Sequence, residues 1–299
     1  MTGRFTEDAM ANAMRQVAKQ LDVANDDATL LRLTNNAVYA LPGAGLVIRI
    51  TRSHGLPERV RKVVALAQWF AHIDAPTIRL AAVPQPIIVD GLPATAWIYL
   101  PQHPPQPTVD DLGPVLRRFH HLGTPPMPLQ AWDPVGDARA RLADAEALAE
   151  TDRHFLLDWC DRLQPQINAL NAEAGTGLLH GDAHAGNLLR RRDGQVVLCD
   201  FDATCLGPWQ VDLVAVAVGE VRFGRAGAHA TLATAYGYDV TTDPAWPLLR
   251  EARELKMVAA AVPLLASAPG VAQEFTTRLH SIQHDDPTAR WTPFADLRT

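Results

Sequence analysis

Cysteine is scarce in this sequence, and the few cysteines present follow no disulfide or metal-binding pattern. The 299 residues include only Cys160, Cys199 and Cys205, with no CxxC pair and no zinc-knuckle spacing. An odd and unpatterned set argues against a disulfide framework and favours a reducing compartment. The first residues, MTGRFTEDAM, lack the apolar stretch of a secretory signal. We therefore expect a cytoplasmic protein.

Long apolar runs and an excess of positive charge are also missing. The most apolar segment, 257–272, is shorter than the roughly 20 residues of a membrane span and contains Pro263 and Pro269. The 27 Lys and Arg residues face 33 Asp and Glu residues, and the net charge is −6. No membrane is expected as a partner, because the apolar segment is too short to span one. No nucleic acid is expected either, because its phosphates bind basic surfaces and this chain carries a net negative charge. The glycine signatures of P-loop and dinucleotide-binding proteins do not occur either.

The order of predicted elements divides the chain at about residue 100. Residues 1–100 combine short apolar strands with one strong amphipathic helix at 57–73. A proline-dense stretch beginning at Pro101 indicates a connector. The remaining chain is mostly helical, apart from a β segment at 178–202. We predict an α+β protein with a small β-rich lobe, 1–100, and a larger, mostly helical lobe, 101–299.

The segment 178–202, LLHGDAHAGNLLRRRDGQVVLCDFD, concentrates the residues that can carry chemistry. At its centre, Asp193-Gly194 predicts a two-residue hairpin turn between apolar arms. In such a hairpin, the numbers of two residues that face each other across the strands always add up to the same value. Asn187 is therefore expected opposite Asp200, with Cβ atoms about 4.5–5.5 Å apart. An amide oxygen and a carboxylate oxygen this close can share a hard cation such as Mg²⁺.

Asp182 lies five residues before Asn187, in a loop that Gly181 and Gly186 allow to turn tightly. It is expected to reach the same end of the hairpin, where it can orient or deprotonate a substrate hydroxyl. Each acid alone has a simpler interpretation, because Asp in a glycine-flanked turn is usually a turn former. Their combination with Asn187 favours a site, since Asp200 follows an apolar strand where an unpaired charge is costly to bury.

Three motifs in this region occur in a recognisable order and spacing: HGDxxxxN at 180–187, DFD at 200–202 and WxxDL at 209–213. Together they resemble the aminoglycoside phosphotransferase family, which shares a protein-kinase-like fold with choline kinases and related small-molecule kinases. The resemblance implies a two-lobe kinase-like architecture, in agreement with the division near residue 100. Strong identity is confined to residues 178–213.

The resemblance implies Mg²⁺-dependent transfer of the γ-phosphoryl group of ATP or GTP to a hydroxyl of a small molecule. Asp182 matches the aspartate that accepts or orients the hydroxyl proton. Asn187 and Asp200 match the metal-holding positions of kinase-type phosphoryl transfer. Most of the catalysis would come from positioning and charge neutralisation.

Three further residues take secondary roles in the same resemblance. His180 matches a position that shapes the catalytic loop, and Asp212 matches an acid that braces this loop through backbone hydrogen bonds. Asp202 stands where protein kinases carry glycine, and it either assists a second metal or caps the turn.

In the first lobe, Arg49 occupies the strand position at which relatives carry the phosphate-pairing lysine. Arginine can hold phosphate oxygens in bidentate fashion, and the alternative is a solvent-facing charge on an edge strand. The backbone of Tyr99 and Leu100 is expected to meet the nucleotide base. The pattern departs from the family in two places, because residues 32–37 replace the glycine-rich loop and helix 57–73 lacks an evident glutamate partner for Arg49.

The acceptor is the least determined part of the interpretation. An aminoglycoside-type antibiotic leads, and with it a role in antibiotic resistance, but a sugar, a choline-like amine or another antibiotic also fits. Glu220, Glu251 and Glu254 are candidates to bind a cationic acceptor, or else solvated charges on helix faces. The oligomeric state, monomer or dimer, stays open.

Two other functions compete with this one. The stretch Gly181-Asp182-x-His184 resembles the metal-binding opening of metallophosphatases, but their downstream Gly-Asn-His and Gly-His-x-His elements are missing. A catalytically silent kinase-like binding protein is favoured by the two departures in the first lobe. The presence of Asp182, Asn187 and Asp200 argues against it.

Overall fold

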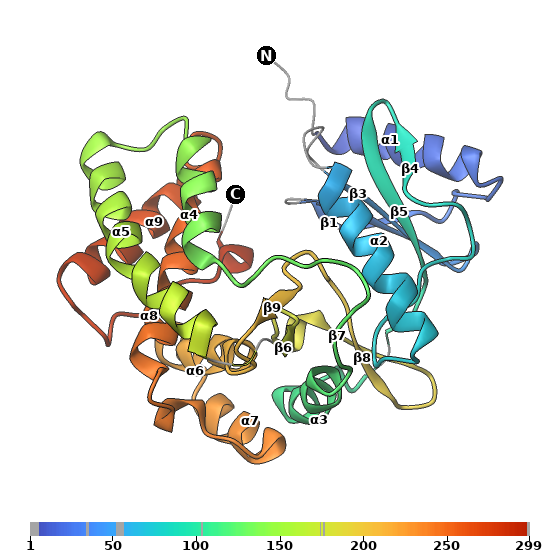
Figure 1. Ribbon diagram of the computed structural model, residues 1–299. Coiled ribbons are helices and arrows are strands. Elements are labelled where there is room, and N and C mark those ends of the chain that lie inside the picture. Colours follow the sequence, from blue (N-terminus) through green and yellow to red (C-terminus); the bar gives the residue numbers. More distant parts are fainter. Residues whose placement is uncertain are drawn as a thin grey trace. The chain divides into compact units, whose positions relative to one another are not determined.

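The computed structural model describes residues 6–33, 36–51, 57–102, 104–173, 175 and 177–297 (Figure 1). Thr34 and Asn35, part of the segment expected in place of a glycine-rich loop, lie outside the described residues. The chain splits into two compact units, each described here by itself. Unit 1 comprises Met1–Thr108, Pro125–Met127 and Ala185–Ala203, and unit 2 comprises Val109–Thr124, Pro128–His184 and Thr204–Thr299. A boundary at residue 100 stays a prediction, and the units additionally assign Ala185–Ala203 to unit 1.

Unit 1 is built on an antiparallel sheet with the strand order β1-β2-β3-β5-β4. The central strand β3 therefore pairs on both sides, and its Arg49 lies opposite Val38 of β2 and Thr95 of β5. The edge-strand alternative for Arg49 is wrong. The strands are β1 (Thr29–Leu33), β2 (Asn36–Leu41), β3 (Leu46–Thr51), β4 (Ile87–Val89) and β5 (Leu92–Ile98).

Side chains alternate between the two faces of this sheet. On one face, Ile48 and Ile50 of β3 are fully buried in a core shared with Met10 and Val17 of helix α1 (Glu7–Gln20). Burial of each such side chain stabilises the fold by about 1.5–3 kcal/mol. Arg49 lies between the two isoleucines, so alternation directs it to the opposite face.

That opposite face carries helix α2 (Pro57–His72) and an aromatic cluster. The ring of Phe201 packs edge-on against Phe70 of α2, with centroids 5.1 Å apart, and lies 6.0 Å from the ring of Trp97 on β5. Phe201 is 1% exposed. These contacts attach the segment that follows residue 199 to the sheet of unit 1.

The predicted hairpin forms between β7 (Leu188–Arg190) and β8 (Val196–Leu198), but its loop contains three residues rather than two. The Arg191 N–H donates to the Gln195 carbonyl at 2.8 Å, and the Gly194 N–H donates to the Arg191 carbonyl at 3.0 Å. Gly194 has φ +83°, a left-handed conformation that glycine adopts without strain. This is a type I turn followed by a left-handed glycine, the common three-residue hairpin loop.

The longer loop shifts the register of the hairpin by one residue. Asn187 lies opposite Cys199, whose N–H donates to the Asn187 carbonyl at 2.9 Å. The predicted opposition of Asn187 and Asp200 is therefore wrong. The physical reason is local, because the Asp193 carboxylate accepts the Gln195 N–H at 3.0 Å and stabilises the wider turn.

Unit 2 is mostly helical, and a short antiparallel pair of strands lies among the helices (Figure 1). Helix α8, which begins at Trp246, ends at Ala259, since Pro263 lies in a separate 3-10 turn, Val262–Leu264, and cannot donate a helical hydrogen bond. The elements are α3 (Val109–His120), α4 (Pro134–Ala143), α5 (Glu150–Glu173), β6 (Gly177–Leu179), β9 (Cys205–Gly207), α6 (Val211–Phe223), α7 (Ala228–Tyr236), α8 (Trp246–Ala259) and α9 (Pro269–Gln283).

Helices α3 and α7 approach each other closely at Gly113. A Cβ atom at this position would lie 2.6 Å from backbone atoms of Ala235 and Tyr236. The Arg117 side chain, one turn further along α3, donates to the Ala235 carbonyl at 2.9 Å. Glycine therefore allows a contact that places the end of α7 beside the end of α3.

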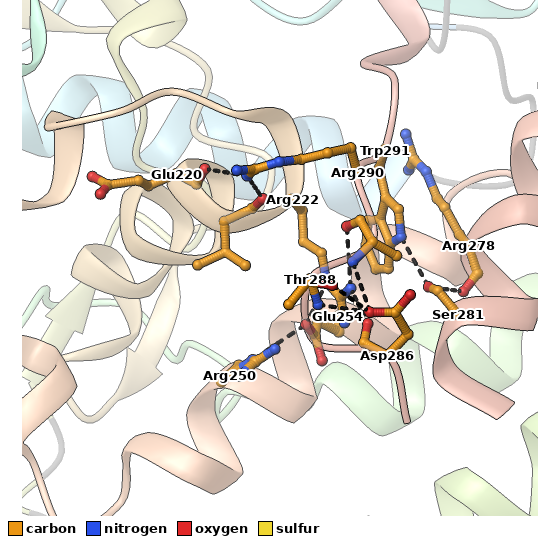
Figure 2. Close-up of polar contacts among 12 residues, drawn as sticks. Glu220, Arg222, Arg250, Glu254, Arg278, Ser281, Asp286, Thr288, Arg290 and Trp291 are labelled. Atoms are coloured by element: carbon orange, nitrogen blue, oxygen red, sulfur yellow. Dashed lines mark hydrogen bonds and ion pairs between the residues drawn. The ribbon is translucent and has the colours of Figure 1, made fainter. Parts of the chain in front are cut away.

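Two buried arginines attach the C-terminal segment to the helices of unit 2 (Figure 2). Arg222 of α6 donates to the Glu254 carboxylate and to the Asp286 carbonyl, both at 2.8 Å. The indole ring of Trp291 lies 4.5 Å from the Arg222 guanidinium and 5.3 Å from that of Arg278 on α9. Because an uncompensated buried charge is strongly destabilising, these pairings are structural necessities of the helical unit.

The α+β prediction is confirmed by the small antiparallel sheet and the mostly helical remainder. Among the described residues, none of the three cysteines forms a disulfide bond. Burial raises the pKa of Cys160 to about 11 and that of Cys199 to about 12, which keeps both thiols protonated and unreactive at neutral pH. Within the described parts of the chain, no helix has both the length and the apolarity to cross a membrane.

Candidate functional site

The loop that carries Asp182 is held in unit 2 by the buried side chain of Asp212 on α6. The Asp212 carboxylate accepts the backbone N–H groups of His180 and Gly181, each at 2.7 Å. It also lies 2.9 Å from Nε2 of His120. Burial raises the pKa of Asp212, but the hydrogen bonds from His120 and the loop backbone outweigh it and lower the pKa below its ordinary value. Asp212 is therefore an ionised acceptor beneath the loop.

His120 and Tyr236 complete this support, and the sequence did not single them out. Because a carboxylate only accepts, His120 Nε2 carries the proton, and its Nδ1 accepts from the Tyr236 hydroxyl at 2.9 Å. The close contact of α3 and α7 brings the two side chains together. No local sequence pattern signals a bond between residues so far apart along the chain.

His180 is a structural residue of the same loop. It is fully buried, and its ring meets that of Phe119 edge-on at 6.0 Å. Its Nδ1 accepts the backbone N–H of Asp182 at 3.4 Å. His184 Nε2 lies 3.9 Å from the Asp182 carboxylate. In the described ranges, no group of three or more His, Cys, Asp or Glu residues is arranged to hold a metal ion, so the metallophosphatase interpretation gains no support.

Helix α8 brings two cations to the Asp182 carboxylate. Arg253 Nη1 lies 3.0 Å from Oδ1, and Lys256 Nζ lies 3.4 Å from the same oxygen and 2.8 Å from the Gly181 carbonyl. Partial burial raises the pKa of Asp182, but Lys256 and Arg253 outweigh it and hold the pKa well below its usual range. Asp182 is therefore ionised at neutral pH and weakly basic.

Neither cation stands out among the sequence motifs. A signal was present, since Arg253 and Lys256 are three residues apart and therefore lie on one face of a helix. Their pairing partner, however, precedes them by more than seventy positions. They line a small hollow of unit 2 together with Asp182 and apolar side chains, which include Trp132, Val211 and Leu249.

In unit 1, Asp202 of the DFD motif binds the strand arginine. Its carboxylate pairs with the guanidinium of Arg49 and lies 3.2 Å from Nη2 of Arg59 on α2. Lys62 Nζ, also on α2, donates to the Asp202 carbonyl at 2.7 Å. Burial raises the pKa of Asp202, but Arg49 and Arg59 outweigh it and lower the pKa. The acid that pairs with Arg49 thus comes from the DFD motif, and α2 supplies cations where the family pattern has a glutamate.

Asn187 and Asp200 also belong to unit 1, and their donor chemistry fits Mg²⁺. Asn187 ends a 3-10 turn, Ala185–Asn187, and is 2% exposed. Asp200 has φ +67°, a left-handed conformation, and its side chain is 34% exposed. Its Oδ1 lies 3.9 Å from Arg49, and its carboxylate accepts no hydrogen bond from the described residues. Amide and carboxylate oxygens are hard ligands of the kind Mg²⁺ takes.

Tyr99 and Leu100 follow β5 and line an open groove of unit 1, which they share with Pro42, Gly45 and residues 190–193. The Tyr99 N–H donates to the Gly45 carbonyl at 2.9 Å. The Leu100 carbonyl accepts from the Gln102 side chain at 2.9 Å. Among the described residues, the Leu100 N–H and the Tyr99 carbonyl have no backbone partner.

The three glutamates expected to meet a cationic acceptor are bonded within unit 2. Glu254 is buried, and Figure 2 shows it between two arginines. These bonds favour a structural role for all three. The partners are the His229 N–H for Glu220, the Trp159 indole and Arg162 for Glu251, and Arg222 and Arg250 for Glu254.

Several solved structures resemble this one. The choline kinase LicA from Streptococcus pneumoniae has a TM-score of 0.64 and 11% identity, covering 90% of this chain and 98% of that chain. A choline/ethanolamine kinase family protein from Mesorhizobium loti has a TM-score of 0.61 and 17% identity, covering 92% and 94%. The aminoglycoside phosphotransferase APH(3'')-Id from Streptomyces rimosus has a TM-score of 0.60 and 17% identity, covering 83% and 97%. At these identities the likeness shows the fold, which is kinase-like as predicted.

No curated protein matches the chain. The family model described as "Phosphotransferase enzyme family" matches residues 27–255, which is more than half of the chain. This range includes all three motifs, and it extends from the sheet of unit 1 to helix α8. The chain therefore belongs to the phosphotransferase enzyme family.

Proposed function

We propose that this protein is a small-molecule O-phosphotransferase that moves the γ-phosphate of a nucleoside triphosphate to a substrate hydroxyl. The observation that carries the proposal is Asp182, an ionised carboxylate in a small hollow, on a loop that Asp212 holds by two backbone hydrogen bonds. Family membership supports phosphoryl transfer. The Streptomyces rimosus enzyme has also been solved in complex with ADP and streptomycin, which supports nucleotide use.

In this proposal, Asp182 orients the acceptor. Its carboxylate accepts a hydrogen bond from the acceptor hydroxyl and directs the oxygen lone pair at phosphorus. Kinase-type transition states are loose, so little proton transfer is needed before the oxygen–phosphorus bond begins to form. Because Lys256 and Arg253 make Asp182 a weak base, it takes the proton late, once the hydroxyl oxygen has become acidic through bonding to phosphorus.

Asn187 and Asp200 are proposed to hold Mg²⁺, as their oxygen donors allow. When bound, the ion neutralises charge on the β- and γ-phosphate oxygens. Arg49 is proposed to hold phosphate oxygens as well, since a guanidinium has five N–H donors and can keep Asp202 while it binds phosphate. The Leu100 N–H and the Tyr99 carbonyl are proposed to meet the nucleotide base.

The test is nucleoside diphosphate release from ATP and from GTP, with Mg²⁺ or EDTA, across sugars, amino alcohols, hydroxy acids and antibiotics. Asp182→Asn should lower kcat by about 10²- to 10⁴-fold, because the neutral amide is a weaker acceptor than the carboxylate and cannot take the hydroxyl proton, while nucleotide affinity stays unchanged. Asp158→Asn, on the exposed side of α5, is the matched control and should keep full activity.

Two outcomes would contradict the proposal. Near-native turnover by Asp182→Asn would remove the role given to that residue. Nucleotide binding without turnover of any acceptor would establish the catalytically silent alternative.

A further inference from the structure

We propose that the acceptor carries an anionic group, a carboxylate or a phosphate, beside the hydroxyl that is phosphorylated. Arg253 and Lys256 of α8 would bind this group in the hollow next to Asp182. The inference rests on the proposed function, in which Asp182 receives the acceptor hydroxyl, and it adds the chemical class of the acceptor.

The first argument is the balance of charge around Asp182. Among the described residues that line the hollow, Asp182 is the one acid, and Arg253 and Lys256 are cations. Both cations lie within 3.4 Å of Asp182 and are only 19% and 21% exposed, so solvent screens them weakly. One carboxylate neutralises one of them, and a positive charge remains. A cationic acceptor would be repelled here, whereas an anionic one would complete the pairing.

The second argument is an unused hydrogen-bond donor. The Nε of Arg253 is buried and has no hydrogen-bond partner among the described residues. A buried donor without a partner is destabilising, so the Arg253 Nε calls for an acceptor that the described residues do not supply, such as an oxygen of a bound ligand. Nη1 is engaged by Asp182, and among the described residues no other carboxylate pairs with the Nε and Nη2 edge of the guanidinium. This edge matches two oxygens of a carboxylate or phosphate.

The third argument concerns the acids that an aminated acceptor would need. Glu251 and Glu254 share α8 with the two cations, but Glu251 is bound by Trp159 and Arg162, and Glu254 is buried on Arg222. Neither glutamate lines the hollow. The charges near Asp182 therefore favour an anionic acceptor over the aminoglycoside type suggested by the family resemblance.

Matched three-carbon compounds test the inference on the full-length protein. Glycerate, glycerol 3-phosphate, glycerol and 3-amino-1,2-propanediol differ mainly in charge, and ligand-observed NMR gives their relative affinities without turnover. We expect at least one anion to bind about tenfold or more tightly than the amine, as a charge-assisted hydrogen-bonded pair provides. Glycerate and glycerol 3-phosphate separate a carboxylate site from a phosphate site.

Variants locate the preference. Arg253→Gln should abolish the preference for the anions over the amine. Arg253→Lys should keep part of this preference, because lysine retains the positive charge but lacks the two parallel N–H donors of the guanidinium. Arg250→Gln, on the same helix but paired with Glu254, is the matched control and should keep the preference. Asp182→Asn should retain or strengthen anion binding, since it frees Arg253, although its turnover is strongly reduced.

The outcomes separate this inference from the proposed function. The proposal of an anionic acceptor is overturned if all four compounds bind equally or undetectably. It is also overturned if the amine binds preferentially and is phosphorylated, although phosphorylation of the amine would still support the proposed function. Anion binding that survives Arg253→Gln overturns the site. Anion preference without diphosphate release from any acceptor overturns the acceptor assignment and the proposed function together.

Discussion

At the scale of single residues, Asp182 and Asp202 are each held by cations of their own unit. Asp182 meets Arg253 and Lys256, and Asp202 meets Arg49 together with cations of α2. Each pairing lowers the pKa of its carboxyl, so both acids stay charged across the physiological range. Asp182 consequently orients a hydroxyl better than it removes a proton.

This gives a prediction for the pH dependence of turnover. Asp182 must be ionised to accept the hydroxyl, and its pKa lies well below the ordinary value of about 3.9. Activity that depends on Asp182 is therefore present above pH 4 and is lost only at more acid pH. Measured between pH 5 and 8, kcat/KM should show no acid limb attributable to this group. An acid limb in that range that is absent from the residual activity of Asp182→Asn would contradict this assignment.

At the scale of elements, contacts between helices position the side chains that hold the loop of residues 180–184. Gly113 lets α3 approach α7, and this approach puts His120 beside Tyr236 and beneath the loop of residues 180–184. The hairpin of β7 and β8 shows a similar dependence on one small residue. There Gly194 takes the left-handed conformation that the three-residue loop requires.

Gly113→Ala should destabilise the protein by about 1–3 kcal/mol, because the new Cβ would overlap the backbone of α7 and force the helices apart. Urea unfolding measures the change. Gly175→Ala is the control, since a Cβ there meets nothing within 4 Å, and its stability should be nearly unchanged. Equal stability of the two variants would show that α3 and α7 do not need the close contact.

At the scale of the whole molecule, carboxylates that are paired or hydrogen-bonded in the fold tie stability to pH. Asp202 and Asp212 have lowered pKa values in the folded protein. A carboxyl with a lowered folded-state pKa contributes stability above its unfolded value, about 3.9, and loses it as pH falls through the folded value. Stability should therefore be high at neutral pH and should fall steeply below about pH 4.

Asp212→Asn tests one of these contributions. The variant should be less stable than the wild type at pH 7, because the His180 and Gly181 N–H groups lose a charged acceptor. The difference should narrow as pH falls below about 4, because the carboxyl then takes up a proton in the unfolded wild type first and in the folded wild type at still lower pH. Thermal unfolding at pH 7, 5, 4 and 3 measures it. A stability difference between the wild type and the variant that stays constant over this pH range would show that the charge of Asp212 contributes little to stability.

Local patterns were enough to predict much of this protein. Apolar periodicity located most helices and the strands of unit 1, and motif spacing identified the family. These signals are local because side-chain alternation and turn preferences act over a few residues. The same locality explains the errors. The Asp-Gly turn is compatible with a two- or a three-residue loop, and the side-chain bond from Asp193 decides for the longer one.

The sequence by itself determined the kinase-like architecture and the positions of Asp182, Asn187 and Asp200 along the chain. Only the tertiary structure decided which charges surround them: α8 supplies the cations of Asp182, and Asp202 supplies the acid of Arg49. The reason is physical, since an ion pair depends on distance in space, and packing of the helices and sheet brings together residues that no local pattern connects.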